Sequence, residues 1–282
     1  MNERFDNENK NIRRSIFVGV LHFGRTELIQ KLVSLLNPES YKVCILDHNS
    51  IPLSKSESDV AYYWNPKNPG YAAGMNFLIK QAQLSQADVG FFLTNDVLIP
   101  HEKLMLWFDM IKTSTFTIQQ PVLVSNDNKI RSGIQYYPSY FHWPLSPWRH
   151  RKYKRLDEDY YSTGFICGAC FSCDMKTFNS KPVFFDEDFF MYYEDQEWSI
   201  RLNSEGHRFA LNSRITVFHQ ESASSGGGIG WYGIKLRWNG LSVFLNKTNA
   251  AALNKFLSKI LFIARMFVLL IRKRAVGLFN LK

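Results

Sequence analysis

The chain has 282 residues, of which 45% are apolar and 15% aromatic, a composition that excludes a disordered polypeptide and indicates a globular fold with a sizeable core. The formal net charge is +9, but residues 235–282 hold 10 basic and no acidic side chains, which leaves 24 basic and 25 acidic side chains in the first 234 residues. A basic C-terminal region on a neutral body favours a membrane surface, and not nucleic acid, as a partner.

The predicted elements begin after a polar N-terminal segment, residues 1–14, which lacks the apolar run of a signal peptide and is expected to be a flexible tail of a cytoplasmic protein. Apolar runs and segments of helical periodicity then alternate. They predict strands at residues 15–20, 41–46, 61–64 and 89–94 and helices at 25–36 and 71–86. This alternation is typical of an α/β fold with a mainly parallel sheet.

Polar clusters follow the predicted strands at residues 47–50 (DHNS), 68–70 (NPG) and 94–96 (TND). Any one of them is explained as a turn. Together, at the carboxyl ends of strands, they predict a bound polar ligand, because ligands of open α/β sheets lie at that edge.

The residue types suggest what is bound. Asp47 can accept hydrogen bonds from a ribose or a base, and Gly70 allows backbone to approach a ligand closely. Asp96 offers a hard oxygen ligand for Mg²⁺ or Mn²⁺. His219, after a predicted strand at 209–218, is either a second metal ligand or a structural histidine. Since the sequence has no Walker or dinucleotide-binding motif and the glycines at 226–228 predict only a flexible loop, we expect a nucleotide held by carboxylates, backbone and a metal.

Three cysteines, Cys167, Cys170 and Cys173, have a spacing that invites a metal cluster. Residues 161–173 predict a single strand, however, on which Cys167 and Cys170 point to opposite faces and Cys167 and Cys173 lie about 20 Å apart. We therefore expect buried thiols, Cys44 included, in a reducing compartment.

Residues 185–201 (FDEDFFMYYEDQEWSIR) combine carboxylates with aromatic rings, a mixture suited to the edge of a pocket. Helical periodicity begins at Tyr193, with Trp198 and Leu202 as the apolar stripe. Glu194 and Asp195 then fall in the first turn, where the helix dipole favours them as anions. The simpler alternative is that Glu194 and Asp195 only stabilise the start of the helix and have no role in a pocket.

The last quarter of the chain predicts a helix at 232–245 and a second one at 256–271, where Lys259 and Arg265 interrupt an apolar sequence. This second segment is too short to span a bilayer and fits an amphipathic helix in the headgroup layer, or else a helix packed on the core. Residues 136–148, rich in proline and aromatic residues, predict either an acceptor-side flap or a packed insertion, and a local basic cluster follows at 148–155.

These motifs, in this order and spacing, resemble glycosyltransferase family 2, most closely its rhamnosyltransferase-like branch that builds bacterial surface polysaccharides. The resemblance covers residues 15–245 and rests on the motifs at 47–50, 68–76 (NPGYAAGMN), 93–96 (LTND), 168–169, 185–190 (FDEDFF) and 193–195 (YED) and on His219. It implies an A-type glycosyltransferase fold and inverting transfer from a nucleotide-diphosphosugar.

The resemblance also implies roles for single residues. Asp195 matches the general base, with Glu194 beside it at the acceptor, and Asp96 and His219 match the ligands of Mg²⁺ or Mn²⁺. The expected nucleotide-sugar-binding residues are Asp47, Asn49, Asn68, Gly70, Asn76, Asn95 and Asp96. One departure is Thr94, which stands where the fullest form of the metal motif has a first acid, and it puts tight metal binding in doubt.

The sequence therefore predicts three regions: the tail at 1–14, a catalytic domain at 15–230 and a helical, basic, membrane-associating region at 231–282. The expected acceptor is a saccharide, carried by a polyprenyl diphosphate, at the inner face of the cytoplasmic membrane. The rival hypotheses are a nucleotide-sugar-binding scaffold without catalysis, which Thr94 favours, and a nucleic-acid-binding protein, which the neutral body disfavours.

Overall fold

The computed structural model describes residues 15–53, 59–125, 130, 155–163, 165–220, 230–247 and 251–279, and only the backbone of 272–279. The predicted tail, the loop at 226–228 and the aromatic segment at 136–148 lie outside the described residues, as does all of the basic cluster except Arg155.

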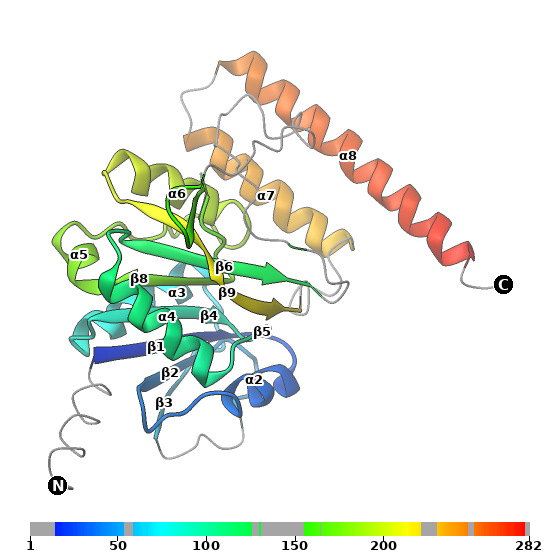
Figure 1. Ribbon diagram of the computed structural model, residues 1–282. Helices are drawn as coiled ribbons and strands as arrows, with labels where there is room; N and C mark the ends of the chain where they lie inside the picture. Colours follow the sequence, from blue (N-terminus) through cyan, green and yellow to red (C-terminus); the bar gives the residue numbers. More distant parts are fainter. Residues whose placement is uncertain are drawn as a thin grey trace, which may run out of the picture.

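One large sheet forms the centre of the molecule (Figure 1). Its strands run in the order β3-β2-β1-β4-β8-β6-β9-β5, with β7 paired to β9. Their bounds are β1 Ile16–His22, β2 Lys42–Asp47, β3 Val60–Trp64, β4 Val89–Thr94, β5 Val97–Leu98, β6 Ile118–Val124, β7 Tyr160–Ser162, β8 Cys170–Asp174 and β9 Phe209–His219. Strands β3, β2, β1 and β4 are parallel, as predicted, whereas β8 joins β4 antiparallel and begins a mixed second half.

Helices cover both faces of the sheet, so β1 is buried on both of its faces. Val18 and Val20 pack with the helices α2 (Thr26–Val33) and α4 (His101–Thr113), whereas Phe17 and Leu21 pack with α3 (Tyr71–Leu84), α5 (Met175–Ser180) and α6 (Glu194–Ser204). A strand that is buried on both faces is expected to have a nearly continuous apolar sequence, and β1 has one. The result is a three-layer α/β architecture.

The sequence interpretation of residues 161–173 as one strand is wrong. Strand β7 ends at Ser162 and β8 begins at Cys170, so Cys167 lies in the connection between them. Its backbone N–H donates to Gln120 Oε1 at 2.9 Å and not to a strand ladder. All four cysteines are free thiols, and the described residues contain no group of three potential ligands that could hold a metal ion.

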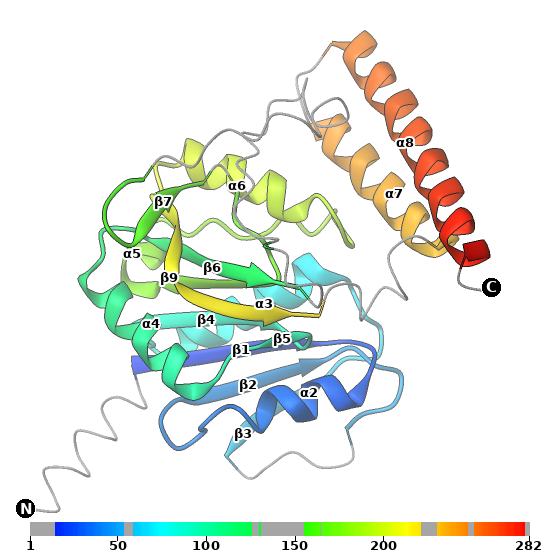
Figure 2. The ribbon, with the colours of Figure 1, turned by 45° about the vertical axis from the view of Figure 1, so that its right-hand side comes forward.

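Two C-terminal helices, α7 (Trp231–Lys247) and α8 (Ala252–Phe279), lie side by side beyond the sheet (Figures 1 and 2). Phe262 of α8 is buried with Leu241, Phe244 and Leu245 of α7, in a cluster that also includes Tyr193. On its other side α8 exposes large apolar side chains, so it packs on the body through one face only. Among the described helices, none, α8 included, combines the length and the hydropathy that a membrane-spanning segment requires.

Candidate active site

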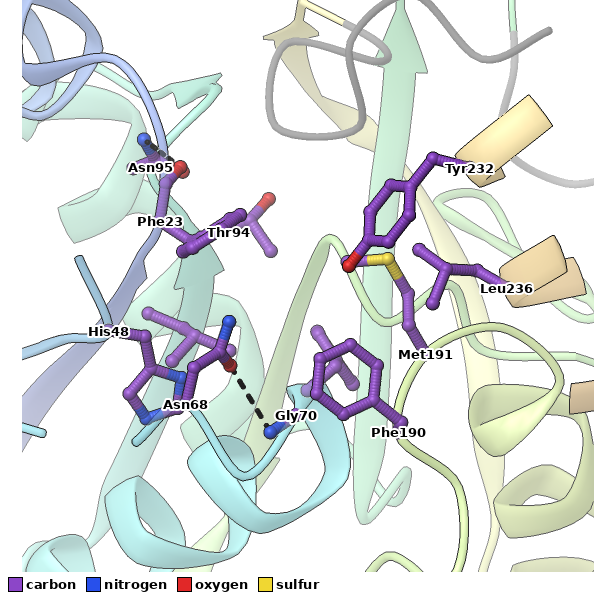
Figure 3. A pocket seen from close by; sticks show the side chains of 12 residues that line it. Phe23, His48, Asn68, Gly70, Thr94, Asn95, Phe190, Met191, Tyr232 and Leu236 are labelled. Carbon is purple, nitrogen blue, oxygen red and sulfur yellow. Dashed lines mark hydrogen bonds between the residues drawn. The ribbon is translucent and has the colours of Figure 1, made fainter. Parts of the chain in front are cut away.

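A pocket lies at the carboxyl ends of β1, β2 and β4 (Figure 3). One side of it is polar and carries His48, Asn68, Thr94 and Asn95, and the opposite side is apolar. The apolar side comes from the loop before α6 and from α7, through Phe190, Met191, Tyr232 and Leu236. Leu21, Phe23, Gly70 and Tyr71 complete the lining. The strand-end clusters at 47–50, 68–70 and 94–96 therefore each contribute to one pocket, as their positions predicted.

The turn at Asn68 and Gly70 brings the two sides together. Asn68 has a positive φ of 42°, and its Oδ1 accepts a hydrogen bond from the Gly70 N–H at 3.2 Å. Gly70 has a φ of 102°, and a Cβ there would lie 2.4 Å from the carbonyl oxygen of Phe190. Only glycine fits. The space beside Gly70, where a ligand was expected to approach the backbone, is thus taken by Phe190, whose carbonyl also accepts from the Tyr71 N–H at 2.7 Å.

Asp47, the residue expected to contact the nucleoside, lies outside the pocket lining. Its carboxylate is fully buried and accepts hydrogen bonds from Tyr62 Oη at 2.7 Å, from the Asn49 N–H at 2.9 Å and from the Leu53 N–H at 3.3 Å. Internal donors thus occupy both of its oxygens, and it orders the loop after β2.

His48, the next residue, lines the pocket; it belongs to the predicted cluster at 47–50, but the sequence analysis gave it no role of its own. Successive side chains of an extended chain point to opposite sides, so the residue after a buried strand-end carboxylate was the better choice. His48 Nε2 has no hydrogen-bond partner among the described residues. Burial lowers the pKa of His48, although the nearby Asp47 raises it, so the ring is neutral near pH 7.

Asn49 and Asn76 also lie outside the pocket lining. The Asn49 side chain accepts from the Gly24 N–H at 2.8 Å and contacts His22 Nε2 at 2.9 Å, so it fixes the loop after β1. Asn76, on α3, accepts from the Phe185 N–H at 2.8 Å and donates to the Phe185 carbonyl at 2.9 Å and to Glu187 Oε1 at 2.8 Å. Both side chains have their polar atoms engaged within the fold. A direct contact of either residue with the nucleotide-sugar stays a prediction.

Asp96 and His219 lie together, as predicted for a shared ligand. The short strand β5 pairs antiparallel with β9 and places Val97 opposite His219, and the Gln220 N–H donates to the Asp96 carbonyl at 2.9 Å. His219 Nε2 is thereby 3.5 Å from Asp96 Oδ1, and Thr94 Oγ1 donates to the same oxygen at 2.6 Å.

This donor set fits a divalent cation. Two ligands at right angles around an ion at about 2.1 Å lie about 3 Å apart, close to the observed spacing. The described chain supplies one carboxylate and one imidazole here, and Mg²⁺ or Mn²⁺ commonly completes its shell with phosphate oxygens and water. Asp96 itself does not line the pocket, but its neighbours Thr94 and Asn95 do.

Asp195, in the first turn of α6, is connected to the pocket by hydrogen bonds through Gly168 and Tyr71. Its Oδ2 accepts from the Gly168 N–H at 3.4 Å, and the Gly168 carbonyl accepts from the hydroxyl of Tyr71, which lines the pocket. A Cβ at Gly168 would lie 2.5 Å from that hydroxyl oxygen, so glycine is required. Burial raises the pKa of Asp195 to about 6, against the lowering effect of the Gly168, Gln196 and Asp195 N–H groups. At pH 7 this carboxyl is mostly ionised.

Glu194 differs from the prediction that both acids are anions. Its side chain is buried, and its Oε2 has no hydrogen-bond partner among the described residues. Burial, and then the charge of Asp195, raise the pKa of Glu194 well above its usual range. The favourable helix dipole is outweighed because the carboxyl is removed from water. One carboxylate of the pair is therefore suited to accept a proton.

No protein-family model and no curated protein matches the sequence. Solved structures do match. Residues 1–349 of S. aureus TarS superpose with a TM-score of 0.52 at 13% identity, over 90% of this chain and 72% of that one, and the same fragment is known with UDP and with UDP-GlcNAc. GalNAc-T7 with UDP, GalNAc and Mn²⁺ matches with a TM-score of 0.57 at 14% identity, over 81% of this chain and 48% of that one. The chain has the A-type glycosyltransferase fold.

Proposed function

We propose that the protein is an inverting glycosyltransferase that moves a sugar from a nucleotide-diphosphosugar to a hydroxyl of a saccharide. The observation that carries the proposal is the arrangement around one pocket of an A-type fold. The Asp96–His219 pair lies beside its polar side, and the Asp195 carboxylate is connected through Gly168 to the lining residue Tyr71. This arrangement provides separate places for a charged donor and for a base.

The donor would occupy the polar side. Asn68 and Asn95 offer amides suited to ribose or base edges, and the His48 ring lies beside them in the lining. Asp96 and His219 would hold Mg²⁺ or Mn²⁺, which offsets the negative charge of a diphosphate leaving group. The occurrence of TarS with UDP-GlcNAc and of GalNAc-T7 with UDP and Mn²⁺ supports a donor of this class.

Asp195 would act as the base. Its carboxylate takes the proton of the acceptor hydroxyl while that oxygen attacks the anomeric carbon and the bond to the diphosphate breaks on the opposite side. One carboxylate suffices for this single displacement, and inversion follows from attack opposite to the leaving group. The buried Glu194 stays protonated beside it and adds no competing charge.

The acceptor would lie against the apolar side, where the exposed rings of Phe190 and Tyr232 provide stacking surfaces for sugar rings. We place the enzyme in the synthesis of a bacterial surface polysaccharide, O-antigen or capsule, as in the rhamnosyltransferase-like branch. The acceptor saccharide would be carried by a polyprenyl diphosphate. The enzyme would then bind peripherally to the inner face of the cytoplasmic membrane.

The exposed face of α8 supports this location. It presents apolar side chains at the spacing of a helical stripe: Leu253, Phe256, Leu257, Ile260, Ile263, Phe267, Val268 and Ile271. Phe256 is 61% exposed and Phe267 is 64% exposed. Residues 235–282 contain only basic charges, so a second copy of the helix would bring cations against cations, whereas anionic lipid would offset them.

Substitution in this stripe is expected to abolish lipid binding. In Phe256→Glu/Phe267→Glu, the loss of two rings that the lipid would bury, at roughly 1.5–3 kcal/mol each, should lower partitioning at least about 100-fold. Co-sedimentation with phosphatidylglycerol and phosphatidylcholine vesicles measures this. Leu84→Glu/Leu106→Glu, at exposed apolar positions of α3 and α4, controls for added charge. If the wild-type protein does not co-sediment with anionic vesicles and elutes as a dimer in size-exclusion chromatography, a second copy of the chain covers the stripe.

A donor screen tests the activity. Purified protein is incubated with UDP-GlcNAc, dTDP-rhamnose or GDP-mannose, with Mn²⁺ or Mg²⁺ and a bacterial lipid extract as the acceptor source. We expect nucleoside diphosphate to be released from one donor only and to require the cation. Saturable donor binding without release would favour the scaffold, which Thr94 at the metal motif supports. Absence of binding to every donor, by calorimetry, would contradict both functions.

A further inference from the structure

Helix α7 lies along the 186–193 segment, which runs from Phe185, the residue that Asn76 hydrogen-bonds, to the start of α6. At one end, Tyr232 and Leu236 of α7 share the pocket lining with Phe190 and Met191 (Figure 3). At the other end, Lys247 Nζ lies 2.6 Å from both Asp186 Oδ2 and Asp188 Oδ2. The helix thus contacts this segment at both ends.

The middle of the contact is a strained turn. Tyr192 and Tyr193 both adopt left-handed backbone, with φ of 70° and 73°, a conformation that is unfavourable for residues other than glycine. They immediately precede Glu194, the first residue of α6, so their conformation sets where the Asp195 carboxyl lies. Surrounding structure must hold the turn. The Arg237 guanidinium lies 4.1 Å from the centre of the Tyr192 ring, and the Tyr193 ring packs 5.8 Å from that of Phe244.

Gly240 permits the closest of these contacts. It stands inside the 17-residue helix α7, where glycine is less favourable than alanine. A Cβ at this position would lie 2.3 Å from the carbonyl oxygen of Tyr192 and 3.0 Å from that of Met191. Both atoms belong to backbone, which has little freedom to move away. The α7 backbone is therefore pressed directly against the strained turn.

We propose that Gly240 is a positioning residue for the reaction, through which α7 holds the Tyr192–Tyr193 turn and so fixes the Asp195 carboxyl at the pocket. The inference rests on the proposed function of Asp195 as the base. It also connects the lipid-facing helix to the site, because Trp238 of α7 packs 5.8 Å from Phe262 of α8. The assignment distinguishes Gly240 from a residue that only stabilises the fold, since its loss should displace one catalytic group and leave the donor side intact.

Gly240→Ala tests the assignment in the full-length protein. A displacement of the base by about 1 Å is expected to lower kcat about 10²-fold, while the KM for the donor identified in the screen stays within two-fold. Hydrogen exchange of the peptide covering residues 189–197 should accelerate, and exchange of α3 should not change. Asn239→Ala, at the exposed neighbouring position of α7, is the matched control and should leave both readouts unchanged.

Lys247→Met provides a second test from the other end of the contact and does not introduce a clash. It should also accelerate exchange at 189–197 and lower kcat more than it raises KM, whereas Lys255→Met in α8 should do neither. The exchange measurement needs no substrate, so it tests the contact between α7 and the 186–193 segment even if no donor is turned over. Wild-type exchange at 189–197 in both variants, or an equal loss of kcat and donor binding in Gly240→Ala, would overturn the proposal.

Discussion

Asp195→Asn is expected to lower kcat by about 10³-fold, within the range usual for removal of a general base, with little change in the KM for the donor. The asparagine keeps the size of the side chain and an oxygen to accept the Gly168 N–H, so the local geometry should persist. What it loses is the ability to take a proton. Nucleoside diphosphate release under saturating donor, cation and acceptor measures the effect.

The pH dependence gives an independent check on the same residue. Burial raises the pKa of Asp195 to about 6, and the ionised form is the active one. The wild-type rate should therefore be level above pH 7 and fall about tenfold per unit below pH 6, as protonation removes the base. Asp109→Asn, on the exposed side of α4, should behave as wild type. Full activity in Asp195→Asn, or a wild-type rate unaltered down to pH 5, would assign the base elsewhere.

The sequence predicted the first half of the sheet because β1, β2 and β4 are continuous apolar runs. It missed β6, whose sequence begins with Ile118, Gln119, Gln120 and Pro121 and has no such run. Both glutamines are nevertheless buried, since Gln119 Oε1 accepts from Trp107 Nε1 at 3.1 Å and Gln120 Oε1 accepts from the Cys167 N–H. The partners of these two side-chain oxygens come from other elements, and a local pattern does not contain that information.

The same limit applies to the site. Strand-end polar residues located the pocket, because the topology brings the carboxyl ends of parallel strands together. The local pattern did not reveal that Asp47 is enclosed by donors from Tyr62 and Leu53 while His48 faces the pocket. The apolar side formed by Tyr232 and Leu236 also depends on how α7 packs, more than 130 residues after β4. Positions at an edge were predictable, whereas the direction and the partners of single side chains required the tertiary structure.

Asp96→Asn is expected to lower kcat by about 10²–10³-fold and to remove its dependence on Mn²⁺ or Mg²⁺, because a neutral amide is a poor ligand for a hard cation and leaves the departing diphosphate uncompensated. Thr94→Asp should act in the opposite direction on binding. The Thr94 hydroxyl already lies 2.6 Å from Asp96 Oδ1, so an aspartate there would add a second carboxylate within reach of the same ion. Titration of Mn²⁺ in the presence of UDP, followed by electron paramagnetic resonance, measures both effects without turnover.

The two variants together decide what the Asp96–His219 pair does. If the pair holds the cation, Mn²⁺ affinity should fall in Asp96→Asn and His219→Ala, rise in Thr94→Asp, and stay unchanged in Asp88→Asn at the exposed opposite end of the strand β4. A like-charge pair without a cation is unfavourable, so Thr94→Asp should also unfold at lower denaturant concentration in EDTA and recover with Mn²⁺. If instead Asp96 only bonds to Thr94 and His219, Thr94→Asp would be destabilised equally with and without the ion, and the diphosphate would have to be stabilised by the pocket's amides alone.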